Sequence, residues 1–248
     1  MALKVQYLGW ASFLITGPSG KTILTDPFLT GDDVLGIPAT PVDYSDLAVD
    51  LILTSHPAND HFAQAMEIMC HSETTKILGD HTTMIMAELA GFGDLNGPRC
   101  ELTTSGATYP FGEFKIKAVD ARHIAFRHLE DGRFITGEPL CYFIKTEGYP
   151  TIFFGGDTSL TMDMKLWGEL YQPEIAIIGI GGVDLDGRSL DEMDPEDAAV
   201  CAKMLGVKKV IPMHYRGKEY LERFKTALKK CAPSCECISM AYGDEMEL

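Results

Sequence analysis

Thr54-Ser55-His56-Pro57-Ala58-Asn59-Asp60-His61 is the stretch that decides what this 248-residue chain can be. It places two imidazoles and a carboxylate close together, directly after the apolar run Leu51-Ile52-Leu53, which is typical of a buried strand. Imidazole and carboxylate are ligands that suit zinc, iron and manganese. The stretch therefore predicts a metal site in the turn that follows this strand.

Three more candidate ligands stand where other predicted strands end. Taken singly each is weak evidence, because an aspartate after two glycines is more often a turn residue, and a histidine after an apolar strand is more often structural. Together they are harder to dismiss, since four of the seven histidines then fall at strand ends. Ligands from the ends of neighbouring strands can converge on one rim, where catalytic loops tend to lie. The three are His123 after 114–121, Asp157 after 151–154 and His214 after 209–213.

The rest of the chain combines short apolar strands with amphipathic helices. Strands are expected at 4–7, 12–15, 21–25, 51–53, 76–78, 114–121, 141–146, 151–154, 174–180, 209–213 and, closing the chain, 236–240. One helix is expected to start at the metal-binding motif, because Phe62, Ala65, Met66 and Met69 recur at helical spacing. Others are expected at 82–89, 160–171, 194–206 (capped by Asp194 and stopped by Gly206) and 218–230. Strands precede helices in each half, which predicts an α/β fold of a four-layer αβ/βα sandwich with mixed sheets, in a single domain over 1–248.

The amino-acid composition of the chain restricts the classes of molecule that it is expected to bind. Acidic residues outnumber basic ones 36 to 21, and a net charge of −15 without a basic stripe argues against nucleic acid. No apolar run could span a membrane and no signal-peptide pattern opens the chain, so we expect a cytoplasmic protein that works without a membrane. The seven cysteines are an odd number, which fits reduced thiols. Cys231, Cys235 and Cys237 could bind zinc but lack a second ligand pair at finger-like spacing; we expect Cys237 in the final strand and the others beside a loop.

Several stretches, in order along almost the whole chain, resemble the metallo-β-lactamase superfamily of hydrolases. The resemblance is to the branch of ascorbate-6-phosphate lactonase-like proteins and their uncharacterised bacterial and archaeal relatives, and the C-terminal half matches best. It implies the metallo-β-lactamase fold and a metal-dependent hydrolase. The stretches are Tyr7-Leu8-Gly9-Trp10-Ala11, Ile23-Leu24-Thr25-Asp26-Pro27-Phe28, the motif at 54–61, Gly156-Asp157-Thr158, Ile180-Gly181-Gly182, Met193-Asp194-Pro195-Glu196-Asp197-Ala198 and Ile211-Pro212-Met213-His214-Tyr215.

The resemblance also implies a set of metal ligands and their roles. Zinc is the expected divalent metal, with manganese and iron as alternatives, and an activated water would be the nucleophile. Asp26 would orient the metal ligands without contacting the metal itself, and Asp60 and His214 would be the catalytic residues. One metal would be held by His56, the second histidine of the family motif and His123, the other by Asp60, His61 and His214, and Asp157 would bridge the two.

Two residues depart from the family pattern. The second motif histidine is Ala58, which offers no ligand atom, and the family's Leu-Gly-His-Ala turn has become Leu8-Gly9-Trp10-Ala11. We therefore expect strong occupancy of the second metal position and weak or no occupancy of the first. Trp10 is expected either to fill buried space or to form an apolar wall of a substrate pocket, and the buried role is favoured because Trp is largely buried on average.

Other residues near the motifs could replace the missing ligand or bind substrate. The candidates for a replacement ligand are His81, His128, Asp120 and Asn59, although a helix start capped by Asp80 explains His81 and an exposed loop explains His128. Arginine suits bidentate binding of phosphate or carboxylate, and the alternative is plain surface charge. The arginines in question are Arg122, Arg127, Arg133 and Arg188.

These observations predict a metal-dependent hydrolase of a small anionic or cyclic ester, such as a lactone or a phosphodiester. A mononuclear enzyme is chemically reasonable, since one well-held zinc activates water. The alternative is a degenerate member that binds a metal or ligand without turnover, as a sensor or scaffold. RNA processing, as in other superfamily branches, is disfavoured by the acidic charge. The expected partner is a small-molecule substrate, and the sequence is compatible with a homo-oligomer.

Overall fold

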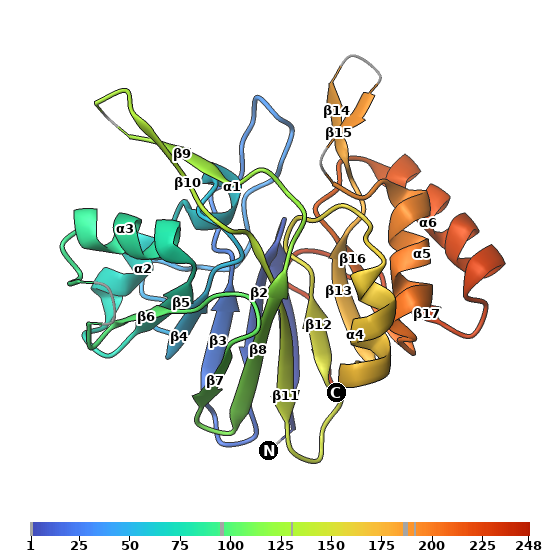
Figure 1. Cartoon of the computed structure of the whole chain (residues 1–248), viewed down its shortest axis with the longest axis horizontal. Coiled ribbons are helices and arrows are strands. Elements are labelled where there is room, and N and C mark those ends of the chain that lie inside the picture. The colour runs from blue at the N-terminus through green and yellow to red at the C-terminus, as the bar shows by residue number, and fades with distance from the viewer. Residues whose placement is uncertain (1, 95–96, 130, 186–187, 191) are drawn as a thin grey trace.

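Two seven-stranded sheets face each other, and helices cover both outer faces (Figure 1). The computed structural model describes residues 2–94, 97–129, 131–185, 188–190 and 192–248, with the backbone alone for 183–185 and 188–190. Both sheets are mixed, because each combines antiparallel pairs with a run of parallel pairs. The expected four-layer αβ/βα sandwich is confirmed.

The first sheet is built from strands within residues 4–102 and closed by the last strand of the chain. Strands β3, β4, β5 and β6 are parallel, and β1 is antiparallel to β2 and β18. In spatial order the sheet contains β18 (Glu245–Glu247), β1 (Lys4–Gly9), β2 (Ser12–Thr16), β3 (Thr22–Thr25), β4 (Leu51–Leu53), β5 (Lys76–Gly79) and β6 (Cys100–Leu102).

The second sheet is built from the middle and the C-terminal half. Strands β7, β8, β11 and β12 are antiparallel neighbours, and β12, β13, β16 and β17 are parallel. In spatial order it contains β17 (Glu236–Cys237), β16 (Lys209–Met213), β13 (Ile175–Gly179), β12 (Ile152–Phe154), β11 (Leu140–Thr146), β8 (Phe114–Asp120) and β7 (Thr108–Phe111).

Three apolar layers hold these elements together. The central layer joins the inner faces of the sheets through side chains such as Leu53 and Phe154. The outer face of the first sheet, with Ile52, packs on α1 (Asn59–Phe62), α2 (Ala65–His71) and α3 (His81–Leu89). The outer face of the second sheet, with Phe143, packs on α4 (Asp163–Tyr171), α5 (Pro195–Leu205) and α6 (Lys218–Cys231). Leu53 and Ile52 therefore belong to different layers, as the period-two alternation of a strand requires.

Helix α5 begins and ends as expected. The side chain of Asp194 accepts a hydrogen bond from the backbone N–H of Asp197, and Gly206 ends the helix at φ 71°. The single helix expected at the motif is wrong, because α1 and α2 are separate. Gln64 interrupts them: its N–H donates to the carbonyl of Pro27, and its side-chain Oε1 accepts from the N–H of Leu29.

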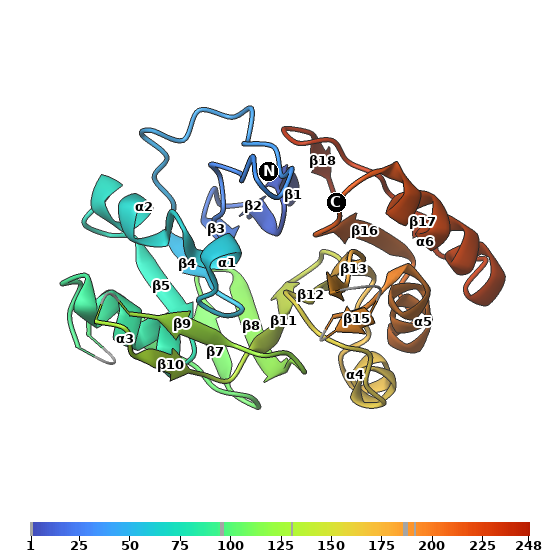
Figure 2. The same cartoon turned by 90° about the horizontal axis from the view of Figure 1, so that it is seen from above.

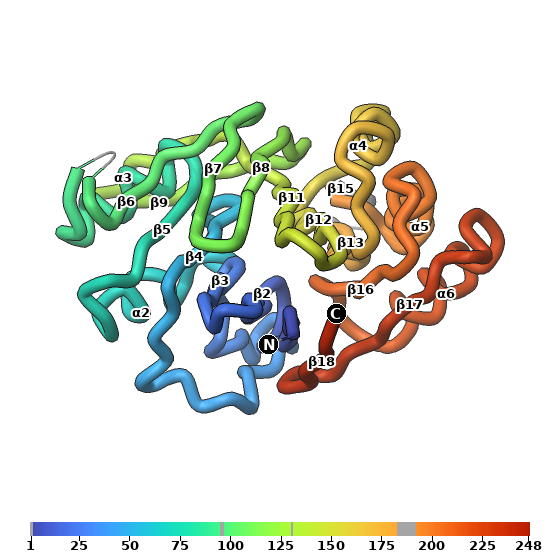
Figure 3. The backbone as a smooth tube through the Cα atoms, turned by 90° about the horizontal axis from the view of Figure 1, so that it is seen from below, coloured from blue at the N-terminus to red at the C-terminus, as the bar shows by residue number. Residues whose placement is uncertain are grey.

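The expected closing strand at 236–240 is also wrong in extent, because β17 ends at Cys237. The chain then turns where Gly243 has φ 95° and the Asp244 carboxylate accepts from the N–H of Ala241. This turn sends the last strand, β18, across to the first sheet, where it pairs with β1. The two termini consequently lie close together, at the end of the molecule shown in Figure 3.

The loops that carry the candidate ligands lie at the other end. Strands β4, β8, β12 and β16 lead into them, and α1 lies near the middle of this end, seen from above in Figure 2. Two hairpins also project there, β9–β10 (Phe126–His128 and Phe134–Thr136) and β14–β15 (Val183–Leu185 and Arg188–Leu190) (Figure 1). None of the helices in the described ranges combines the length and hydropathy needed to cross a membrane.

Candidate metal centre

The structure brings all six expected ligands together where four strands end. Ligand atoms of His56, His123 and Asp157 lie within 4.8 Å of one another, and so do those of Asp60, His61 and His214. The two triads adjoin, since Nε2 of His61 lies 3.0 Å from Oδ2 of Asp157 and Nε2 of His214 lies 3.3 Å from the same oxygen. Each triad therefore offers two imidazoles and one carboxylate.

The imidazoles of His56 and His61 are held by hydrogen bonds at their Nδ1 atoms. Nδ1 of His61 lies 2.8 Å from Oδ2 of Asp26, and Nδ1 of His56 lies 3.0 Å from Oγ of Ser55. Ser55 Oγ donates its own proton to Asp26 at 2.6 Å, so it must accept from Nδ1–H of His56. Both rings then present Nε2 to the cluster, which is the tautomer that a metal ligand needs.

Three buried atoms at the centre of the cluster have no hydrogen-bond partner: Nε2 of His56, Nε2 of His61 and Oδ1 of Asp157. Leaving buried polar atoms unpaired is costly. Burial opposes protonation of His61, but the carboxylates of Asp157 and Asp60 outweigh it and raise the pKa of this ring well above its usual value. A divalent cation between these atoms would satisfy them, and the nitrogen and oxygen donors suit zinc, iron or manganese. The residues present therefore fit a bound metal.

The charges of the cluster are strongly coupled. Burial and the neighbouring His61 hold the pKa of His56 well below its usual value, so this ring is neutral and ready to bind a cation. Burial opposes the protonated form of His214, but Asp157 and Glu192 outweigh it and raise the pKa of His214 to about 10. Without a cation, the carboxylates therefore keep some of the imidazoles protonated.

Trp10 contacts the second triad directly. Its indole Nε1 donates to Oδ2 of Asp60 at 3.0 Å, and its ring centroid lies 4.1 Å from that of His214. The side chain is buried, so the favoured expectation for Trp10 is confirmed, and the hydrogen bond adds a polar contact that was not predicted. Three residues at the centre have left-handed backbone conformations that non-glycine residues rarely adopt: Trp10 (φ 50°), Asp26 (φ 33°) and His214 (φ 53°).

Sequence reasoning missed Glu192. Its Oε2 lies 3.3 Å from Nδ1 of His214, so it orients His214 much as Asp26 orients His61. It also forms a third possible metal-binding group with Asp157 and His214. Glu192 stands two residues before the helix cap Asp194, and nothing in its local sequence distinguishes it from a surface glutamate.

The side chain of Ala58 adds no ligand to the first triad. Of the histidine and carboxylate substitutes, His81, His128 and Asp120 lie outside the metal-binding groups found among the described residues. His81 begins α3, and the Asp80 side chain caps that helix by accepting from the N–H of Thr83, as the alternative explanation required. His128 is exposed as expected, although it lies in strand β9 rather than in a loop.

A cavity of about 520 Å³ opens over the cluster. Of the four arginines considered, Arg127 lines it, whereas Arg122 lines a different cavity and Arg133 pairs with Asp131 on the surface. The side chain of Arg188 lies outside the described residues. The other lining residues are His56, Ala58, Asn59, Asp60, His123, Ile124, Phe126, His128, Asp157 and Glu192.

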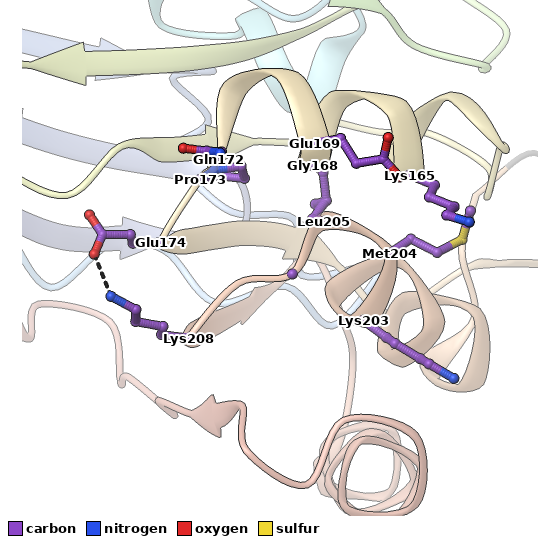
Figure 4. A pocket seen from close by; sticks show the side chains of 11 residues that line it. Lys165, Gly168, Glu169, Gln172, Pro173, Glu174, Lys203, Met204, Leu205 and Lys208 are labelled. Carbon is purple, nitrogen blue, oxygen red and sulfur yellow. Dashed lines mark hydrogen bonds and ion pairs between the residues drawn. The ribbon is translucent and has the colours of Figure 1, made fainter.

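A larger cavity of about 760 Å³ lies far from this chemistry, between α4 and α5 (Figure 4). Its residues precede β13 and β16, at the opposite ends of the strands from the metal centre. Lys208 is paired there with Glu174 at 2.8 Å, and the lining includes no histidine or cysteine. We therefore assign the chemistry to the smaller cavity.

The C-terminal cysteines are not brought together as a metal site. All seven cysteines are free, and no metal-binding group among the described residues includes one. Cys231 ends α6 and donates to the carbonyl of Ala199, while Cys237 lies in β17 and Cys235 in the loop before it. Cys237 and the loop position of Cys235 agree with the sequence-based expectation, except that β17 is not the final strand.

Comparisons with known proteins agree with this geometry. The model of the β-lactamase superfamily domain matches residues 4–214. The chain is 35% identical over 251 residues to a UPF0173 metal-dependent hydrolase of Pelotomaculum thermopropionicum (99% of this chain, 100% of that protein) and 31% identical over 250 residues to one of Rubrobacter xylanophilus (98% and 96%). It is also similar to the solved structure of Igni18, a metallo hydrolase from Ignicoccus hospitalis, with a TM-score of 0.78 at 25% identity, covering 100% of this chain and 99% of that one.

Proposed function

This chain belongs to the β-lactamase superfamily and, within it, to the UPF0173 family of metal-dependent hydrolases, and we propose that it hydrolyses a small anionic ester, lactone or phosphodiester. The observation that carries the proposal is the set of inward-facing buried atoms without partners, Nε2 of His56, Nε2 of His61 and Oδ1 of Asp157. We propose zinc as the metal, because imidazole and carboxylate in three-ligand sets are typical of catalytic zinc.

Some residues of the chain would hold the metal, and others would contact the substrate. A divalent cation bound here supplies the Lewis acidity that activates water near neutral pH. Asp26 and Ser55 fix the tautomers of His61 and His56. The side chain of Asp60 is 33% exposed, against 4% for Asp157, so Asp60 is the carboxylate that substrate and solvent reach first.

The cavity supports a small molecule as substrate. Its volume of about 520 Å³ falls within the range of small-molecule sites. Carboxylates and histidines form its metal-binding side, while Ile124 and Phe126 add apolar surface. We propose the cytoplasm as the location, supported by seven free cysteines that suit a reducing compartment.

A second function is favoured by one observation, the methyl group of Ala58 where the family pattern has a ligand. A protein that keeps a metal in the second triad and turns nothing over would act as a sensor or scaffold. The six surviving ligands argue against this alternative, since they still converge in one cluster.

The test is an assay of metal-free protein reconstituted with Zn²⁺, Mn²⁺ or Fe²⁺ on a panel of nitrophenyl esters, lactones and phosphodiesters. We expect metal-dependent turnover that D60A lowers at least about 100-fold, whereas D43A, which removes an exposed carboxylate, leaves it unchanged. Protein that binds metal tightly and hydrolyses no member of the panel would support the binding function instead.

A further inference from the structure

One basic side chain lines the cavity over the metal centre. Among the described lining residues, Arg127 is the single lysine or arginine, and it shares the cavity with the carboxylates of Asp60, Asp157 and Glu192. Arg127 is therefore the permanently charged cation of the described lining, and a guanidinium is well suited to bind a carboxylate or phosphate.

A hydrogen bond to the metal-binding motif at 54–61 helps to fix the position of Arg127. Along β9, Phe126 and His128 are exposed and Arg127 is half-buried, so its side chain lies on the opposite face of the strand. Its Nη1 donates to the carbonyl oxygen of Pro57 at 3.3 Å. Because Pro57 lies between His56 and Ala58, the guanidinium is anchored beside the first triad, on the side of the missing imidazole.

Arg127 is not neutralised by a carboxylate among the described residues. No ion pair among the described residues includes it, and burial lowers the pKa of its guanidinium. Arg133, on the partner strand of the same hairpin, differs in both respects, because its side chain is 76% exposed and pairs with Asp131 at 2.7 Å. An arginine presents five donors, so Arg127 keeps donors for a ligand after its bond to Pro57.

We propose that Arg127 determines substrate specificity by binding a carboxylate or phosphate group of the substrate beside the metal centre. This inference rests on the proposed function and narrows its substrate class to small amphipathic oxyanions. Ile124 and Phe126, which are 62% and 47% exposed and line the same cavity, contact the apolar part of the molecule. The scissile bond then lies between this subsite and the side chains of Asp60 and His214.

The test compares two esters of similar length, neutral 4-nitrophenyl butyrate and mono-4-nitrophenyl succinate, with the metal-loaded wild type, R127M, R127K and R133M. A charged hydrogen bond contributes enough that R127M should raise KM for the succinate ester about 10- to 100-fold. KM for butyrate should stay within about twofold, R127K should recover part of the loss, and R133M should match the wild type. Equal effects on both esters, or none, would overturn the proposal.

A binding measurement keeps the proposal testable if neither ester is cleaved, an outcome that counts against the proposed function alone. Benzoate and phenyl phosphate are titrated calorimetrically into the four metal-loaded proteins, and the tighter of the two identifies the oxyanion. We expect R127M to weaken that ligand at least about tenfold and R133M to leave it unchanged. Equal affinity in R127M and wild type would overturn the anion subsite, whether or not the protein is an enzyme.

Discussion

The indole Nε1 of Trp10 donates a hydrogen bond to Oδ2 of Asp60 at 3.0 Å, and the same oxygen lies 3.4 Å from Nε2 of His214. The indole also packs against the His214 ring. One side chain thus positions two members of the second triad. The carbonyl of Trp10 accepts from the N–H of His214 at 3.2 Å, so the backbone contributes to the same arrangement.

Replacing Trp10 by Phe should weaken metal binding at the second triad about 10- to 100-fold, because Asp60 loses the donor that orients it. Affinity is measured by competition with a chromophoric chelator. W10H, which restores an N–H donor, should recover part of the affinity. A W10F protein that binds metal as tightly as wild type would show that Trp10 only fills space.

Trp10 also provides a direct signal of metal binding, because the chain has two tryptophans and the other, Trp167, lies on α4. We expect Co²⁺ or Cu²⁺ to quench the emission of Trp10, so that W167F retains the quenching and W10F loses it. Quenching that survives in W10F would place the metal elsewhere.

Gly156 has a backbone conformation and a close contact with Ser55, beside the metal centre, that only glycine accommodates. It has φ 51°, and a Cβ added there would meet Cβ of Ser55 at 2.5 Å. Gly206 has φ 71° but open space around its added Cβ, so G206A isolates the backbone cost of about 1–2 kcal/mol. G156A should lower the free energy of unfolding by about 1–3 kcal/mol more than G206A does, because the added methyl group overpacks against Ser55. It should also displace Ser55 from His56. Urea unfolding of the metal-free proteins measures both losses, and equal losses would contradict this account.

Sequence reasoning succeeded where local pattern and tertiary structure agree. The strands at Leu51–Leu53 and Lys209–Met213 are, apart from the half-buried Lys209, apolar runs buried on both faces, and their bounds were predicted without error. The candidate ligands follow these strands closely, so a strand assignment was enough to place them at one rim. Asp194 and Gly206 also mark their helix by chemistry that depends on no distant residue.

The features that were missed depend on contacts between distant segments. Gln64 leaves the helix because Pro27 and Leu29, far away in the sequence, take up its backbone N–H and its side chain. The β9–β10 hairpin has no buried stripe, since Phe126 and Phe134 are exposed, so no alternation could reveal it. Glu192 gains its role only when folding brings it to His214.

Restoring the family ligand at position 58 should add a metal. Ala58 has φ −63° and ψ 160°, an extended conformation open to any residue, so A58H introduces no backbone strain. We expect about one tightly held metal per chain in the wild type and two in A58H, with higher turnover, as measured by elemental analysis after dialysis. A58Q, of similar size but without an imidazole, serves as the control. Two tightly held metals in the wild type would refute the expectation that Ala58 weakens the first position.

Metal affinity should rise with pH, because the cation competes with protons on the imidazoles. Burial opposes protonation of His214, but Asp157 and Glu192 raise its pKa to about 10, above the usual 6.5. In the metal-free protein this proton stabilises the fold fully below pH 6.5, and the stabilisation is lost as pH rises through 10. Metal binding must displace the proton, so the affinity should increase at least about tenfold per pH unit between pH 6 and 8. Calorimetry in buffers of different ionisation enthalpy counts the protons released, and E192Q, which removes a negative charge from His214, should lower that count. An affinity independent of pH would mean that His214 is neutral before the metal arrives, or that it is not a ligand.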